Sequence, residues 1–184
     1  MREKIKGICE VGILVAIGLV LKIISDLIPF LNMFEGGTID LSMLPIILIG
    51  LRCGYKYSFI GSTIYWLLAW LIGGLKIDHA FLEILLDRFI PYTIGYGISG
   101  LYQKYRVKPF ICSIFIILSG LIRLSSHTLS GIILWSDIFN IHDFLLSIIP
   151  NLLYNLTYVG VTTLLSVVLF ISLNKVLFLR ASSL

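Results

Sequence analysis

Charged residues are scarce in this sequence. Only 13% of its 184 residues are Asp, Glu, Lys or Arg, and 58% are hydrophobic. A soluble domain is typically about 25% charged and about 45–50% apolar. The composition therefore excludes an ordinary soluble domain and predicts an all-α integral membrane protein. At this length we expect one transmembrane domain over residues 1–184, with no room for a separate soluble catalytic domain.

Cysteine is also rare, and the spacing of the cysteines matches no known metal-binding or redox motif. Cys9, Cys53 and Cys112 lie far apart, are odd in number and include no CxxC pair. This pattern excludes a disulfide framework and a zinc site, and we expect neither a metal nor a cofactor. The net charge is +4, but the basic residues form no single patch, so we expect no nucleic-acid partner.

Long apolar runs are what the sequence does have. A helix needs about 20 residues to cross the hydrocarbon core of a bilayer. The first run follows a basic start, as in a signal peptide, but it has no clear cleavage site and is long enough to span, so we interpret it as a retained helix. The sequence predicts a bundle of six transmembrane helices in the cell membrane, over residues 8–31, 39–54, 55–75, 80–102, 109–135 and 144–178.

The basic residues predict the orientation of this bundle. Ten of the fourteen lie at alternate ends of the spans: Arg2, Lys4, Lys6, Arg52, Lys56, Lys104, Arg106, Lys108, Lys175 and Arg180. The positive-inside rule then places both termini in the cytoplasm, in agreement with an even number of spans. The opposite ends carry mostly acidic residues, so we expect an electronegative outer mouth that favours a cationic solute.

The fifth segment contains polar residues that a lipid-facing helix would not need. In RLSSHTLSGIILW, residues 123–135, four side chains recur every fourth position and so lie along one side of a helix: Arg123, His127, Gly131 and Trp135. Gly131 leaves space between His127 and Trp135 for a neighbouring helix or for a ligand. Alternatively, Arg123 and His127 are buried structural partners of acids on the fourth segment, and Trp135 lies at the membrane interface.

Those acids are Glu83 and Asp87, which are four residues apart and can face the same side. Ionisable residues inside a span are costly and are candidate functional residues. The two carboxylates could relay protons, act as an acid/base pair or offer negative charge to a bound cation. No nucleophile with a base and an orienting group accompanies them, so we expect a protein that is not an enzyme.

Two further segments carry candidate residues. The sixth has two pairs with a spacing of four, whose amides and hydroxyls can bind a ligand or a neighbouring helix: Asn151 with Asn155, and Tyr154 with Tyr158. The first has Gly12 and Ala16, small residues that permit close helix contact. That contact could be with a partner membrane protein or with another span of the same chain.

Four stretches together resemble the thiamine-specific substrate-binding subunit, or S component, of the energy-coupling factor (ECF) vitamin transporters. They are GGTIDLSMLPIILIGLRCG (36–54), HAFLEILLDRF (79–89), RLSSHTLSGIILW (123–135) and YN (154–155). The third is the most specific, because that family also has a basic residue, a His four positions later, and then a Gly and a Trp at this spacing. The resemblance covers nearly the whole chain.

The resemblance implies a six-helix subunit that binds one vitamin near its outer face, between the fourth, fifth and sixth helices. Such a subunit docks on a transmembrane coupling protein, which two cytoplasmic ATPases drive, and itself hydrolyses nothing. The small-residue docking motif of the family matches Gly12 and Ala16.

The resemblance also implies roles for individual residues. Trp135 matches the indole that stacks on thiamine, and Asn155, next to Tyr154, matches a ligand-binding Asn. His127 and Arg123 match a His and a basic residue that lie toward the hydroxyethyl or diphosphate end of the ligand. The pyrimidine-binding acid is Glu83 or Asp87, of which we favour Asp87.

Three features depart from the family pattern. The outer loop near residues 36–40 lacks the Trp found in some members. Arg88 follows the fourth-helix acid where an aromatic residue is usual, and Pro150 stands where a Tyr usually precedes the helix-six Asn. The expected aromatic cage is thus thinner, which leaves a different vitamin or a thiamine precursor as an alternative ligand. A stand-alone proton-coupled carrier, with a relay through Glu83, Asp87 and His127, is the second alternative.

Overall fold

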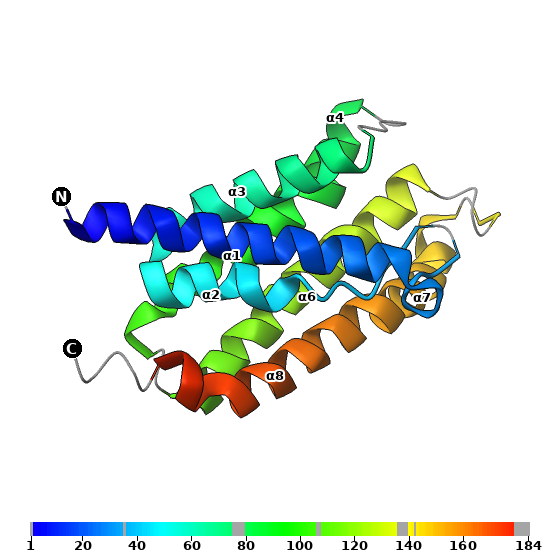
Figure 1. Cartoon of the computed structure of the whole chain (residues 1–184). Coiled ribbons are helices and arrows are strands. Elements are labelled where there is room, and N and C mark those ends of the chain that lie inside the picture. Colours follow the sequence, from blue (N-terminus) through cyan, green and yellow to red (C-terminus); the bar gives the residue numbers. More distant parts are fainter. Residues whose placement is uncertain are drawn as a thin grey trace.

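The computed structural model describes residues 2–34, 36–74, 80–105, 108–135, 140–141 and 143–178. This part of the chain is helical and contains no strand; Asn32 and Thr38 form an isolated antiparallel bridge in the connection between the first two long helices. Figure 1 shows the helices running side by side along one common direction.

The described residues form six long helices, of which the fourth is kinked at Tyr102. The first three are α1 (Arg2–Leu27), which a short turn η1 (Pro29–Leu31) follows, α2 (Met43–Cys53) and α3 (Tyr55–Ile72). The fourth consists of the consecutive elements α4 (Ala80–Glu83), η2 (Ile84–Ile94), α5 (Gly95–Gly97) and η3 (Ile98–Tyr105). The fifth is α6 (Pro109–Leu134), and the sixth joins α7 (Phe144–Asn155), η5 (Leu156–Gly160) and α8 (Val161–Phe178). The predicted six-helix, all-α fold is confirmed.

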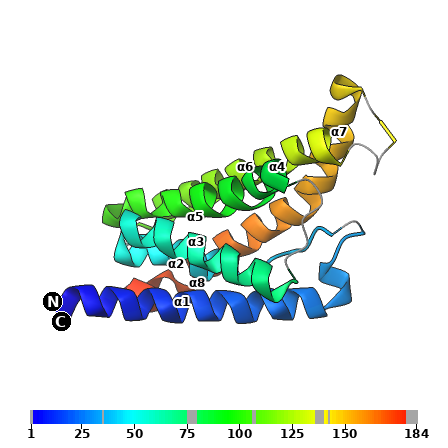
Figure 2. The ribbon, with the colours of Figure 1, turned by 90° about the horizontal axis from the view of Figure 1, so that it is seen from above.

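Helix length decides which elements face lipid. Three described stretches are long and apolar enough to cross a membrane: Lys4–Leu27, Pro109–Leu134 and Phe144–Val176. In contrast, α2 has 11 residues and extends only about 16 Å, about half of a bilayer's hydrocarbon core. All of its residues from Met43 to Leu51 are buried, so α2 forms the centre of the apolar core, between α1 and the other helices (Figure 2).

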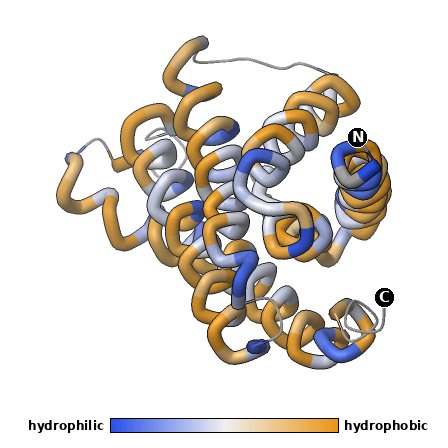
Figure 3. The backbone as a smooth tube through the Cα atoms, turned by 90° about the vertical axis from the view of Figure 1, so that its left-hand side faces the viewer, coloured by the Kyte–Doolittle hydropathy of each residue, from blue (hydrophilic) through white to orange (hydrophobic). Residues whose placement is uncertain are grey.

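The outer surface of the bundle is apolar. Ile13 and Val20 on α1 and Leu164 on α8 are among many large hydrophobic side chains that are exposed, and Figure 3 shows hydrophobic residues along most of the helices. Charged residues such as Asp40 and Arg123 are buried instead. This reversal of the soluble pattern is what a bilayer requires, because acyl chains solvate the apolar exterior and polar groups must find partners inside.

Two helices lose regular α geometry at the same end of the bundle. The η2 segment is π-helical around the internal proline Pro91, and η5 is π-helical directly after Asn155. A proline lacks the backbone N–H of a regular helix, and short π-helical stretches frequently occur at functional sites. The start of α1 and the end of α8 lie together at the opposite end of the bundle (Figure 1).

Candidate functional site

A cavity of about 490 Å³ lies at the end of the bundle where α1 ends and α7 begins. We call it the main cavity. All eight ligand-site residues predicted from the sequence line it: Glu83, Asp87, Arg123, His127, Gly131, Trp135, Tyr154 and Asn155. It also includes residues that were not in that set: Lys22, Gly36, Gly37, Thr38, Asp40, Arg88, Tyr92, Asn151 and Tyr158. The fourth, fifth and sixth helices therefore meet around one space.

The carboxylate of Asp87 is held from α6. Ser130 Oγ donates a hydrogen bond to Asp87 Oδ2 over 2.7 Å, and Trp135 Nε1 donates to the same oxygen over 3.3 Å. His127 Nδ1 lies 3.0 Å from Asp87 Oδ1. Residues 127, 130 and 135 share the inner side of α6, so one helix fixes both oxygens of this acid at the cavity wall.

Arg123 has a different partner from the one that the sequence suggested. It forms its ion pair with Asp40, at 3.8 Å from Nη1 to Oδ2, and not with Glu83 or Asp87. Its Nη1 also donates to the hydroxyl of Tyr96 over 2.7 Å. Asp40 and Arg123 are only 1% and 2% exposed, so this pair is almost fully buried, although both residues border the main cavity.

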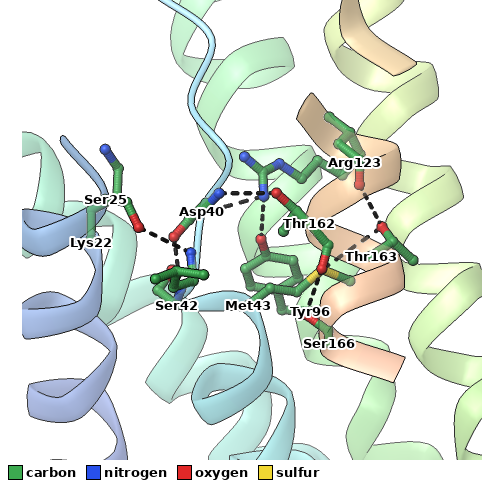
Figure 4. Close-up of polar contacts among 12 residues, drawn as sticks. Lys22, Ser25, Asp40, Ser42, Met43, Tyr96, Arg123, Thr162, Thr163 and Ser166 are labelled. Atoms are coloured by element: carbon green, nitrogen blue, oxygen red, sulfur yellow. Dashed lines mark hydrogen bonds and ion pairs between the residues drawn. The ribbon is translucent and has the colours of Figure 1, made fainter. Parts of the chain in front are cut away.

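Asp40 belongs to the connection between α1 and α2, and several helices hold it in place (Figure 4). Its backbone N–H donates to Thr162 Oγ1 on α8 over 2.9 Å, and Ser42 N–H donates to its Oδ1 over 2.9 Å. The sequence showed Asp40 only as one of the acids at the outer ends of the spans. Its pairing with a residue 83 positions later requires the folded bundle.

Aromatic side chains surround Arg123 and His127 in the cavity. The Arg123 guanidinium carbon lies 5.3 Å from the ring centre of Tyr92 and 6.0 Å from that of Tyr158. The same two rings flank His127, with centroid distances of 6.3 and 6.2 Å. Tyr154 packs edge-on against Tyr158 at 5.8 Å. The sequence suggested a thin aromatic cage, whereas the structure places Tyr154, Tyr158 and Tyr92 in the same cavity as Trp135, and of these Tyr92 was not among the candidate residues.

The two asparagines of α7 are bonded along their own helix. Asn151 Nδ2 donates to the carbonyl of Ser147 over 2.9 Å, and Asn155 Nδ2 donates to the carbonyl of Asn151 over 2.8 Å. The Tyr158 hydroxyl donates to Asn155 Oδ1 over 2.5 Å. Asn155 is therefore oriented by its neighbours, with its side chain at the cavity wall.

Gly131 makes room for the neighbouring helix. A Cβ atom at this position would run into the side-chain oxygen of Asn151 on α7. Of the two occupants that the sequence left open for this gap, a helix or a ligand, the structure has the helix directly against Gly131. Because Gly131 also lines the main cavity, the close approach of α6 and α7 sets the width of the cavity there.

The connection after α1 closes one side of the cavity. Gly37 N–H donates to the Tyr154 hydroxyl over 3.1 Å, and that hydroxyl donates to the Phe34 carbonyl over 3.3 Å. A Cβ at Gly37 would collide with the ring of Tyr158. Tyr154 thus ties this connection to α7.

The two predicted docking residues lie on α1, away from the main cavity, and the second candidate acid lies at the cavity. Gly12 and Ala16 are exposed on α1, and no atom of the described residues lies within 4 Å of a Cβ placed at Gly12. They do not pack internally; the buried side of α1 carries Val11 and Val15. Glu83 is 5% exposed and lies at the cavity beside Asp87, so both acids can contact a ligand. In the described part of the chain, no group of three His, Cys, Asp or Glu residues could hold a metal ion.

The sequence matches the family model of the thiamine transporter protein (Thia_YuaJ) over residues 8–180. The chain belongs to this family. The predicted resemblance to thiamine-specific S components is thereby confirmed at the level of the family.

Relatives of this family share both sequence and fold with the chain. The thiamine transporter ThiT of Bacillus subtilis (strain 168) is 27% identical over 166 residues, which cover 85% of this chain and 81% of the relative. The solved structure of ThiT from Listeria monocytogenes superposes with a TM-score of 0.77, covering 94% of this chain and 95% of that one, at 19% sequence identity. The second comparison shows that the six-helix arrangement is the same.

Proposed function

We propose that this membrane protein binds thiamine in the main cavity and serves thiamine uptake as the S component of an ECF transporter. The family supports thiamine as the solute. The observation that carries the assignment to this cavity is the Asp87 carboxylate, which α6 fixes beside the indole of Trp135.

The chemistry of thiamine matches the wall of the cavity. Its thiazolium ring is permanently cationic, and an aromatic face attracts a cation by about 0.5–2 kcal/mol. Trp135 and Tyr158 offer such faces. An ionised carboxylate accepts about four hydrogen bonds, and Asp87 already has three protein partners, so it can accept one more from the aminopyrimidine. We therefore assign the pyrimidine contact to Asp87 and not to Glu83.

Arg123 does not oppose a cationic ligand in this arrangement. A guanidinium at the cavity wall would repel the thiazolium if its charge were uncompensated. Here Asp40 lies 3.8 Å away and two tyrosine faces cover the guanidinium, so the positive charge is offset within the protein. Arg123 is then a structural residue that shapes the cavity.

The proposed orientation places both termini in the cytoplasm and the cavity at the outer face. Arg52 at the end of α2 and Lys104 in η3 lie at the end of the bundle away from the cavity, together with the basic start of α1. Basic residues are enriched on the cytoplasmic side of membrane proteins. The cavity can then take its ligand from outside the cell.

Delivery of the ligand needs partners in this proposal. The exposed small residues Gly12 and Ala16 leave a flat strip on α1 where another membrane helix can approach closely. We assign this strip to the ECF transmembrane coupling protein, with energy from two cytoplasmic ATPase subunits. The subunit described here supplies recognition and no catalysis.

Calorimetry on the purified protein tests the ligand. We expect saturable thiamine binding that Trp135→Ala weakens strongly, while Phe89→Ala, which removes an exposed ring of η2 outside the cavity, leaves the affinity unchanged. Absence of thiamine binding, or equal affinity in Trp135→Ala, contradicts the assignment. A thermal-shift panel of other vitamins and thiamine precursors then separates the alternative ligands.

Uptake in cells tests the partners. Thiamine uptake should require the coupling protein and the ATPase subunits. Uptake that persists without them and collapses with the proton gradient would favour the proton-coupled carrier instead.

A further inference from the structure

A cavity of about 380 Å³ lies between α1, α3 and η2, beside the main cavity. We call it the side cavity. It shares three lining residues with the main cavity: Lys22, Arg88 and Tyr92. The rest of its wall comes from α1 and α3, which contribute nothing else to the main cavity, so the two cavities adjoin at the three shared residues and differ in the rest of their walls.

The rim of the side cavity belongs to the lipid-facing surface. Ile23 and Leu27 on α1 and Ile72 on α3 line it, and these side chains are 40%, 74% and 57% exposed. In a bilayer such residues contact acyl chains. A molecule that enters between them comes from the membrane and brings an apolar part with it.

The wall of the side cavity is aromatic. Trp66 and Trp70 lie with ring centroids 6.2 Å apart at an interplanar angle of 37°. Trp66 Nε1 donates to Thr93 Oγ1 over 2.7 Å, so the polar atom of this indole is satisfied inside the protein. The ring presents an apolar face to the cavity, and tryptophan is enriched at the depth where headgroups meet acyl chains.

The charges of the side cavity do not balance within the described structure. Lys22 forms an ion pair with Asp26 one turn later on α1. Arg88 forms no ion pair with any described residue, and its Nε is buried without a hydrogen-bond partner. A cation inside a membrane span is costly unless an anion accompanies it, and a guanidinium fits the geometry of phosphate oxygens.

The depth of these cations suits a lipid headgroup. Lys22 lies five residues before the end of α1, which is about 8 Å along the helix axis. Lys22 therefore lies close to the level at which the phosphates of a bilayer are found, and Arg88 lines the same cavity. A phosphate at Arg88 and an acyl chain on the tryptophans would complete both halves of the cavity.

We propose that the side cavity binds an anionic phospholipid, with its phosphate at Arg88 and Lys22 and one acyl chain against Trp66 and Trp70. This site adjoins the proposed thiamine site and shares Arg88 and Lys22 with its wall, but its aromatic half, Trp66 and Trp70, lies outside the main cavity, and it does not depend on which vitamin occupies that cavity. The bound lipid supplies the counter-charge that Arg88 lacks among the described residues, and so stabilises α1 and α3 against η2.

Native mass spectrometry and thermal unfolding of the purified protein test this site. Phosphatidylglycerol should remain bound to the protein and raise its unfolding temperature by roughly 5 °C, whereas phosphatidylcholine with the same acyl chains should not. Arg88→Gln should abolish this preference and Arg88→Lys should retain most of it. Lys108→Gln removes one charge at the opposite end of the bundle and should leave the preference unchanged.

A variant that keeps the charge provides an independent arm. Ala69→Leu fills the side cavity from α3 without touching Arg88, and it should reduce lipid retention as Arg88→Gln does. The Ala69→Leu variant tests lipid binding in the side cavity even if Arg88→Gln fails to fold. Equal binding of the two phospholipids, or an unchanged preference in Arg88→Gln or Ala69→Leu, overturns the proposal. Equal stabilisation by glycerol 3-phosphate, which has no acyl chain, also overturns it in favour of a water-soluble anion.

Discussion

Two acid–base pairs each include one residue of α6, and these residues, Arg123 and His127, lie four positions apart on the same side of that helix. The two pairs differ in burial. The inner pair, Arg123 with Asp40, has side chains that are 3% and 1% exposed. The outer pair, His127 with Asp87, has side chains that are 11% and 18% exposed and lies at the main cavity. Both pairs line the main cavity, but the inner pair is almost fully buried by its protein partners, whereas the outer pair is more accessible to a ligand.

The two pairs also differ in how many helices contribute their hydrogen-bond partners. Arg123 and Asp40 are enclosed by Tyr96 and Thr162, which come from two further helices. Within the described part of the chain, the hydrogen-bond partners of the Asp87 side chain come from α6 and from Trp135, which caps the end of that helix. A charged side chain that several helices enclose contributes mainly to stability. A charged side chain that one helix orients at a cavity can bind a ligand. Substitutions can therefore separate stability from affinity along one helix.

The largest effect is expected at the inner pair. Arg123→Met leaves Asp40 buried without its cation, and removing one partner of a buried pair costs about 3–5 kcal/mol. The free energy of unfolding in detergent should fall by that amount. The double variant Asp40→Asn/Arg123→Met should recover much of the loss, because neither charge remains. A double variant as unstable as the sum of the two single variants would show that the residues are not coupled.

The outer pair should affect affinity instead. Asp87→Asn removes the negative charge that faces the ligand, and a hydrogen bond to a charged group contributes about 1.5–3 kcal/mol. We expect thiamine affinity in calorimetry to fall about 10- to 100-fold, while the unfolding temperature changes little. Glu83→Gln serves as the matched control and should have the smaller effect. The reverse ranking would transfer the pyrimidine contact to Glu83.

A substitution at Gly131 should reduce stability by less than the loss of the Arg123–Asp40 pair. Gly131→Ala brings a methyl group against Asn151, and overpacking typically costs about 1–3 kcal/mol. Thermal unfolding should show this loss, and Asn151→Ala in the same chain should relieve part of it by removing the opposing oxygen. No relief would mean that the glycine is required for a reason other than the approach of α7.

The smallest effect is expected at Tyr158. Tyr158→Phe removes the hydroxyl that donates to Asn155 Oδ1 but keeps the aromatic face. Loss of one such hydrogen bond costs about 1 kcal/mol, so stability should fall slightly. Thiamine affinity should fall less than in Tyr158→Ala, which also removes the ring. Equal losses in the two variants would exclude a cation–π role for this residue.

Local periodicity explains why much of this could be predicted from the sequence. The six apolar runs define the six helices, and the spacing of four places Arg123, His127 and Trp135 on one side of α6. The pairing of Arg123 with Asp40 could not be predicted, because nothing local links residues so far apart. The contribution of Tyr92 was missed for a related reason: it lies on the π-helical η2, where the regular helical spacing no longer tells which residues share a side.

The fluorescence of Trp135 tests the central claim most directly. The chain has three tryptophans, so the double variant Trp66→Phe/Trp70→Phe leaves Trp135 as the only indole. If thiamine occupies the main cavity beside Trp135, titration should quench this single emission saturably, with the affinity that calorimetry gives. The matched variant Trp135→Phe, which keeps the other two indoles, should show no saturable quenching. Unchanged Trp135 emission in a protein that binds thiamine by calorimetry would place the vitamin elsewhere and contradict the account.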